Sequence, residues 1–304
     1  MKKAITRTIV RLAVLALVIA IGYSFFGKIE TVKHDPVFAD SNGNVTTTMH
    51  NIDNMEVVTL DVPESTEAPV VEETMPEVPA PILWDENVDL VPYYHEQDAN
   101  MMSYLLYTPT NIQEGQKLPL LIWLHGSGEK NVDEATFRTR GLPAVLESME
   151  LTPNAFILCP QLDGAYDLGA WNNEGALVSV SNLVNYIVAN NPAIDTENIS
   201  LSGHSLGGSG ALYMAQSMDY VNKVAPMSSY TARVVLPIGA TAKFFVGSTA
   251  CGEDATCVQV AKDLEASGHE VFFYDCGHGE LPATVFAVNA ETGESDVLTW
   301  LLTK

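Results

Sequence analysis

The stretch "NISLSGHSLGGSGALYMA", Asn198 to Ala215, contains a β-prone run, a glycine-rich turn and a helical run in direct succession. Its first part, up to Gly203, favours a strand, and the small and apolar residues from Leu206 to Ser217 favour a buried helix. Glycines in the turn Gly203-His204-Ser205-Leu206-Gly207 let the backbone reverse sharply and let strand and helix pack closely. The pattern predicts that Ser205 is held out over the end of a sheet.

Short apolar runs that end at a breaker recur on both sides of this stretch. They lie at Met101 to Thr108, Leu118 to Gly126, Asn154 to Pro160, Lys223 to Ser229, Ala242 to Gly247 and His269 to Asp275. Helical patterns alternate with them, at roughly Gly141 to Met149, Ala176 to Asn190, Thr256 to Ser267 and Ser295 to Leu302. This alternation predicts a mostly parallel sheet with helices on both faces. Such sheets bind ligands beyond the carboxyl ends of their strands, so we expect the site there.

The hydrophobic content and net charge of the chain restrict the kinds of molecule that it is expected to bind. The chain has 304 residues, 47% of them hydrophobic, which is enough for a large packed core. Its formal charge of −23 argues against nucleic acid as a partner, because phosphates require a basic surface. Neutral or cationic partners are favoured.

The N-terminal part differs from the rest. Basic residues precede an uncharged run from Leu12 to Gly27, which predicts a signal anchor within residues 1–29 or, alternatively, a cleaved signal peptide. Both place the remaining chain outside the cytoplasm, with the membrane contacted only through this segment. Residues 30–81 are acidic and rich in Pro, Glu and Thr, which predicts a disordered stalk, although a propeptide would look the same. Residues 82–304 form the predicted catalytic domain.

Ser205 needs a base, because a serine hydroxyl is a weak nucleophile until its proton is removed. In a strand-turn-helix elbow the acid and then the histidine follow the serine in the chain. Two histidines, His269 and His278, follow Ser205. His269 precedes the last strand and is expected at the amino end of the sheet. His278 follows that strand in "DCGHGEL", so we predict His278 as the base.

The acid of the site is expected after the strand Ala242 to Gly247. The loop that follows it reads "STACGEDATC" and contains an adjacent pair of acids, Glu253 and Asp254. Asp254 stands directly before the next helical run and is the first choice, with Glu253 as the alternative. Its predicted role is to hold the His278 tautomer and to stabilise the imidazolium.

Four cysteines are present: Cys159, Cys251, Cys257 and Cys276. Because disulfides persist outside the cytoplasm, we expect Cys251 and Cys257 to form a disulfide that holds the acid loop in place. A zinc site is disfavoured because no second close Cys or His pair accompanies them, so we expect no metal. Cys159 and Cys276 are not expected to pair with each other.

The oxyanion of acyl transfer needs preorganised N–H donors. The backbone of Leu206, the residue after the nucleophile, is one predicted donor. A second is expected from "HGSGE", His125 to Glu129, with Ser127 preferred and Gly126 or Gly128 as neighbours that could contribute. The alternative is a plain glycine turn in which His125 is a structural hydrogen bonder.

Four segments together resemble the α/β-hydrolase superfamily, in its branch of polyhydroxybutyrate-depolymerase-like esterases and predicted peptidases. They are "PLLIWLHGSGEKNVD", "FILCPQ" followed by "AWNN", "ISLSGHSLGGSGAL" and "DCGHGEL", and the resemblance covers about residues 99–304. It implies an α/β-hydrolase fold and a serine hydrolase that needs no cofactor. It also implies the triad Ser205, Asp254 and His278, the oxyanion donors Leu206 and Ser127, and Trp171 as a wall of the pocket. "STACGE" lengthens the usual acid turn, which keeps Glu253 open as the acid.

The substrate class stays open at the level of sequence. Little chain separates the strand ending at Ser229 from the one beginning at Ala242, so no large lid domain is expected. An open cleft suits exposed ester or peptide groups, including those of polymers, and Tyr166, Trp171 and Tyr230 either line it or simply pack. Esterase is the leading hypothesis, a serine peptidase with the same triad is the alternative, and a surface-displayed binding module without activity is the second.

Overall fold

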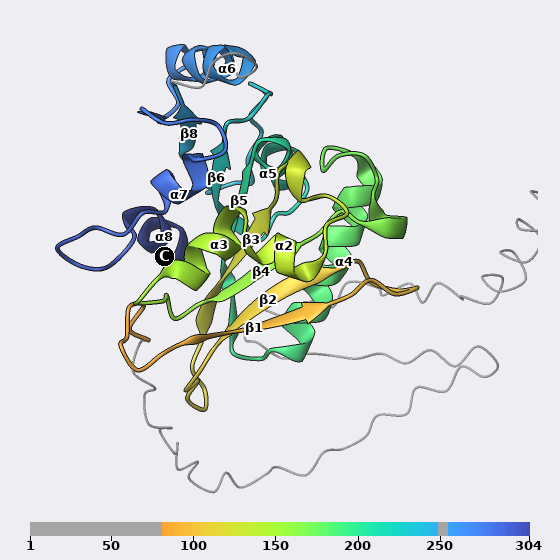
Figure 1. The fold of residues 1–304 in the computed structure, drawn as a ribbon, viewed down its shortest axis with the longest axis vertical. Coiled ribbons are helices and arrows are strands. Elements are labelled where there is room, and N and C mark those ends of the chain that lie inside the picture. Colours follow the sequence, from red (N-terminus) through yellow and green to blue (C-terminus); the bar gives the residue numbers. More distant parts are fainter. Residues whose placement is uncertain (1–80, 249–254) are drawn as a thin grey trace, which may run out of the picture. The chain divides into compact units, whose positions relative to one another are not determined.

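The computed structural model describes residues 81–248 and 255–304, which form a sheet with helices on both faces (Figure 1). The sheet has nine strands in the order β1-β2-β4-β3-β5-β6-β8-β9, with β7 beside β6. β1 and β2 are antiparallel and β2 is antiparallel to β4, whereas the other neighbours are parallel. The strands are β1 Leu90–His95, β2 Tyr104–Pro109, β3 Leu118–Leu124, β4 Phe156–Pro160, β5 Ile194–His204, β6 Val221–Met227, β7 Thr241–Ala242, β8 Phe244–Gly247 and β9 Val271–Tyr274.

The helices cover the two faces in separate groups. They are α2 Glu134–Arg138, α3 Gly141–Ser148, α4 Glu174–Asn190, α5 Leu206–Ala215, α6 Ala255–Ala266, α7 Leu281–Val285 and α8 Asp296–Leu302, with short 3-10 turns η1 Ser127–Glu129 and η2 Gly164–Tyr166. Apolar residues of α4 and α5 pack on one face, and those of α2, α3, α7 and α8 pack on the other. Figure 1 shows α4 and α2 on opposite sides of the sheet.

The central strand β3 shows why both faces are covered. All seven of its residues are buried, so it has no polar face for water. Leu120 and Ile122 belong to the core under α4 and α5, whereas Leu121 and Trp123 belong to the core under α3 and α8. Because successive side chains of a strand point to opposite faces, a continuous apolar run requires a helix layer on each side.

The predicted fold class is confirmed: the sheet is mostly parallel, and every strand and helix expected from the sequence is present. Three further elements, β1, α2 and α7, had no distinct sequence signal. The described chain from Ser228 to Ala240, after β6, contains no helix, so no lid domain lies there.

The predicted N-terminal segments fall outside the described residues. The signal segment, residues 1–29, and residues 30–80 of the predicted stalk therefore stay sequence predictions. Within 81–248 and 255–304, no helix is both long and apolar enough to cross a bilayer.

Candidate active site

Ser205 stands at a strained turn between β5 and α5. Its backbone has φ 57° and ψ −114°, an unusual conformation for a residue with a side chain. Its N–H donates to the carbonyl oxygen of Met227 at the end of β6 (2.8 Å), and its own carbonyl accepts from Ser209 in α5 (3.1 Å). Backbone strain that neighbouring strands hold in place is characteristic of functional sites, and here it positions the predicted nucleophile.

The glycines around Ser205 are required by close backbone contacts. A Cβ atom on Gly207 would lie 1.9 Å from the carbonyl oxygen of Leu124, and one on Gly208 would lie 2.3 Å from that of Met227. Helix α5 therefore sits directly against the carboxyl ends of β3 and β6. This contact brings the N-terminus of α5, with its partial positive charge, beneath the Ser205 turn.

A cleft of about 450 Å³ opens at this edge of the sheet and brings the main predicted residues together. Its lining includes Gly126, Ser127, Glu129, Arg140, Ser205 and His278. The ring of His278 lies 4.5 Å from that of His204 and 6.2 Å from that of Tyr230, measured between centroids. His269, in contrast, precedes β9 and contacts Phe244 (5.4 Å between ring centroids). The structure therefore puts His278, and not His269, in the cleft with Ser205.

Of the two predicted oxyanion donors, Ser127 lines the cleft and Leu206 directly follows Ser205, which also lines it. Leu206 is the first residue of α5, so its N–H has no partner within the helix. Ser127 begins the η1 turn on the opposite side and lines the cleft. Acyl transfer requires N–H donors from separate segments near the nucleophile, and this is the role predicted for these two backbone groups.

The loop that carries Ser127 is held by its carbonyl oxygens. His125 Nδ1 donates to the Gly126 oxygen (2.6 Å), Arg140 donates to the Gly128 oxygen, and Gln161 Nε2 donates to the Glu129 oxygen (3.2 Å). Each donor comes from a different part of the chain. With these carbonyls bound, the peptide planes are fixed, and so is the direction of the N–H groups of the loop.

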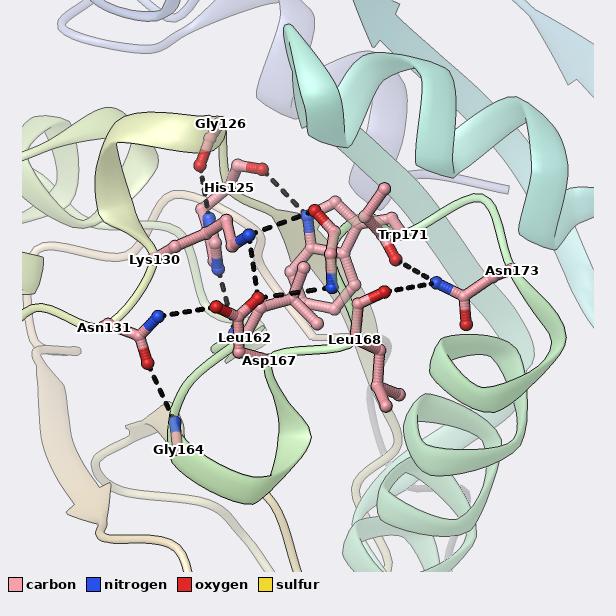
Figure 2. Close-up of polar contacts among 12 residues, drawn as sticks. His125, Gly126, Lys130, Asn131, Leu162, Gly164, Asp167, Leu168, Trp171 and Asn173 are labelled. Atoms are coloured by element: carbon pink, nitrogen blue, oxygen red, sulfur yellow. Dashed lines mark hydrogen bonds and ion pairs between the residues drawn. The ribbon is translucent and has the colours of Figure 1, made fainter. Parts of the chain in front are cut away.

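His125 joins this loop to the segment after β4 (Figure 2). Its Nε2 accepts from the backbone N–H of Leu162 (3.0 Å), so its Nδ1 must carry the proton that binds Gly126. The imidazole is wholly buried, and burial lowers its pKa to about 4. His125 is therefore a neutral structural hydrogen bonder, which is the alternative role that the sequence left open, and it braces the candidate oxyanion loop.

A second set of polar contacts fixes the segment that faces His125 (Figure 2). Asp167 pairs with Lys130 (2.7 Å) and accepts from Asn131 (2.7 Å), and Asn131 in turn accepts from the Gly164 N–H (2.9 Å). The hydrogen bond from Lys130, followed by that from Asn131, lowers the pKa of Asp167. Lys130 and Asn131 directly follow the η1 turn, so these contacts anchor its far end.

The three aromatic residues proposed for the pocket occupy different positions. Trp171 is wholly buried, donates from its indole N–H to the His125 oxygen (2.9 Å), and packs against Gly210. It lies behind the oxyanion loop rather than on the lining of the cleft. Tyr166 packs partly against the core under α4 and α5. Tyr230 is 42% exposed and its ring lies near that of His278, so of the three it is the one in contact with a residue that lines the cleft, and its role towards substrate stays a prediction.

Three ionisable residues that line the cleft, Glu129, Arg140 and His204, were given no catalytic role from the sequence. Glu129 is buried, and this burial raises the pKa of its carboxyl, an effect that nearby Arg140 opposes. Burial, and secondarily the neighbouring His278, lower the pKa of His204 to about 3. With so low a pKa, the His204 imidazole is a weak base.

The acid loop begins next to the His278 loop. A Cβ atom on Gly247, the last residue of β8, would lie 2.7 Å from the Cys276 oxygen and 3.2 Å from the Gly277 oxygen. The next described residue of this loop, Ser248, donates to the Tyr274 oxygen (2.8 Å). Asp254 and Glu253 lie outside the described residues, as does Cys251, so the choice of acid and the Cys251–Cys257 disulfide stay predictions.

In the described residues, neither the remaining cysteines nor the possible metal-ligating side chains form a disulfide or a metal site. Cys159 and Cys276 are buried free thiols, on or beside strands β4 and β9, which four other strands separate. In residues 81–248 and 255–304, no group of three or more His, Cys, Asp or Glu side chains is placed to hold a metal ion.

The fold and the strained serine turn define an α/β-hydrolase, a class of enzymes that includes serine hydrolases. A family model described as "Putative esterase" matches residues 98–285, and the chain belongs to this family. No curated protein matches the chain.

Several solved structures are similar to the chain, and the first of those described next supports the fold. A structure described as that of a thermostable esterase has a TM-score of 0.50 and 18% identity, over 71% of this chain and 64% of that chain. A feruloyl esterase module from Clostridium thermocellum has a TM-score of 0.45 and 14% identity, over 64% and 83%. The acylaminoacyl peptidase of Pyrococcus horikoshii has a TM-score of 0.43 and 12% identity, and the match spans 66% of this chain but 38% of that one.

Proposed function

We propose that the chain is a serine hydrolase that cleaves carboxylic esters through an acyl-enzyme. The observation that carries this proposal is the cleft that holds Ser205, at the strained turn, together with His278. Ser205 Oγ attacks the ester carbonyl while His278 takes its proton and passes it to the leaving alcohol. The N–H groups of Ser127 and Leu206 bind the oxyanion, and a water activated by His278 then releases the acid.

The third member of the proposed triad is Asp254. The support for it is the contact of Gly247 with Cys276 and Gly277, which starts the acid loop beside the His278 loop. A carboxylate there would hold the imidazole tautomer and stabilise its charged form. Asp254→Asn is expected to lower kcat far more than Glu253→Gln, and the reverse order would transfer the role to Glu253.

The reaction is tested with the purified chain and a Ser205→Ala variant. Short-chain, acetyl and feruloyl esters are assayed beside peptide substrates. Ester hydrolysis that disappears in Ser205→Ala supports the proposal. Hydrolysis of peptides alone would reassign the same machinery to a peptidase, and the absence of both would leave a binding module.

We further propose that the enzyme acts outside the cytoplasm, tethered by residues 1–29. The support is the N-terminal sequence, in which basic residues precede an apolar run. Residues 30–81, which are acidic and rich in Pro, Glu and Thr, would then form the tether. Carbonate extraction of membranes and N-terminal sequencing test it. Retention in the membrane with an intact N-terminus is expected, whereas a soluble product that begins after residue 20 would show a cleaved, secreted form.

A further inference from the structure

The active-site cleft continues past the helices α3 and α7. A second hollow of about 540 Å³ lies along these two helices. Its lining shares Val145, Ser148 and Ala283 with the lining of the cleft that holds Ser205 and His278. The two spaces therefore adjoin at these three residues, over which a molecule with its ester group at Ser205 would reach the second one.

The second hollow is apolar and nearly without charge. Beyond the three shared residues, it is lined by Met149, Glu150, Leu151, Phe286, Ala287, Val288 and Gly293. Glu150 is the one charged side chain among these residues, and no Lys or Arg lines the hollow. A carboxylate or phosphate would meet a like charge there and find no cation.

Exposure of this surface also points to an apolar occupant. Val288 is 45% exposed and Met149 is partly exposed, whereas Phe286 beneath them is wholly buried. Burying exposed apolar side chains against a substrate chain is favourable in proportion to the area removed from water. Covering these exposed apolar side chains with an apolar substrate chain should therefore contribute to the binding free energy.

We propose that this hollow, the chain groove, binds a neutral apolar chain of the ester substrate. The inference rests on the proposed ester hydrolysis at Ser205 and specifies its substrate class: esters that carry a neutral apolar chain on one side. Each methylene that the groove covers should raise kcat/KM by up to about fourfold, as burial of a methylene does elsewhere.

Two series of esters locate the chain. The first is 4-nitrophenyl acetate to decanoate, with a growing acyl chain, and the second is ethyl to decyl acetate, with a growing alcohol. Both are assayed below the concentrations at which the substrates form micelles. We expect kcat/KM to rise steeply up to about eight carbons in one series, which identifies the side of the ester that enters the groove. Profiles that are flat in both series would overturn the proposal, while Ser205-dependent cleavage of the acetates would leave the esterase function standing.

Variants test the groove itself. Val288→Asp places a carboxylate in it and should lower the octanoate-to-acetate ratio of kcat/KM by about tenfold or more. Ser148→Trp, at an exposed position where the two spaces join, should lower the same ratio by blocking the passage. The matched control is Val178→Asp on α4, a valine that is 51% exposed and lies outside the groove, which should keep the wild-type ratio.

The variants also separate the groove from other uses of the surface. If Val288→Asp and Ser148→Trp keep the wild-type ratio, the proposal fails. If they change the sedimentation coefficient instead, the hollow is a contact between copies of the chain, and the proposal fails as well. A Val288→Asp chain that does not fold leaves the decision to Ser148→Trp.

Discussion

The Ser205 turn and the Gly126–Glu129 loop face the same cleft, but different interactions hold them. At the Ser205 turn, the backbone of α5 presses on the ends of β3 and β6, and only glycine fits at Gly207 and Gly208. In the Gly126–Glu129 loop, side chains from His125, Arg140 and Gln161 bind the carbonyl oxygens. A steric contact tolerates no added atom, whereas hydrogen bonds can be lost one at a time. The two halves of the site should therefore fail in different ways.

Removing the nucleophile should have the largest effect on turnover. Ser205→Ala is expected to lower kcat for 4-nitrophenyl acetate by roughly 10⁴- to 10⁶-fold, because no acyl-enzyme can form. The thermal midpoint should change little. Steady-state kinetics with Ser217→Ala, an exposed serine in the turn after α5, provides the control. A Ser205→Ala enzyme within tenfold of wild type would exclude Ser205 as the nucleophile.

A single methyl group at the elbow should disrupt folding. Gly207→Ala places its Cβ 1.9 Å from the Leu124 oxygen, so the contact between α5 and β3 must open. We expect a loss of about 3 kcal/mol or more in the free energy of unfolding, or no folded protein. Urea unfolding followed by circular dichroism measures it.

The matched variant for this test is Gly279→Ala, where an added Cβ meets nothing within 4 Å. Its unfolding midpoint should stay near that of the wild type. If both variants unfold alike, the close approach of α5 is not what fixes the turn.

Loss of one loop contact should lower turnover and leave stability nearly intact. Arg140→Met frees the Gly128 oxygen and is expected to lower kcat by about ten- to a hundredfold, with KM little changed, because the misplaced N–H groups act on the transition state. Arg140→Lys should recover part of this loss. The control is Arg138→Met, two positions away, whose side chain pairs with Glu134 and Glu147. Equal kinetics for the Arg138 and Arg140 variants would contradict the positioning role.

Burial of a neutral His125 should make the stability of the chain depend on pH. The pKa of His125 is about 4 in the folded chain and about 6.5 when unfolded, so the unfolded state binds more protons between these values. Above pH 6.5 the imidazole is neutral in both states, and the free energy of unfolding has its full value. As the pH drops towards 4, the unfolded state binds a proton that the folded state does not, so the free energy of unfolding falls by at most about 3 kcal/mol. Urea unfolding at several pH values should show a shallower fall for His125→Asn than for His269→Asn. Identical slopes would argue against a neutral, buried His125.

The same contrast explains what could be predicted from the sequence. The strand, the glycines and the helix around Ser205 are consecutive in the sequence. The turn from Gly203 to Gly207 could therefore be predicted from local residues alone. The His278 loop was also identified, because His269 and His278 fall on opposite ends of one strand. Two contacts of the Gly126–Glu129 loop are not local, since the bond from Arg140 to Gly128 spans 12 positions and that from Gln161 to Glu129 spans 32. Nothing in the sequence near Arg140 or Gln161 pointed to these contacts.

Trp171 shows a related limit. The "AWNN" segment was correctly tied to the site, but the indole packs behind the loop and binds the His125 oxygen instead of facing substrate. A sequence places a residue near a site more readily than it tells which side of a loop the side chain occupies. The direction depends on Gly210, whose missing Cβ makes room for the indole.

The most direct test of the account is labelling with a fluorophosphonate, which phosphonylates an activated serine. Intact mass and peptide mapping should show one adduct on Ser205, lost in Ser205→Ala and slowed strongly in His278→Ala. The Arg140→Met variant should label more slowly than Arg138→Met. Labelling at another residue, or equal labelling of Ser205→Ala, would contradict the claim that this strained turn carries the nucleophile.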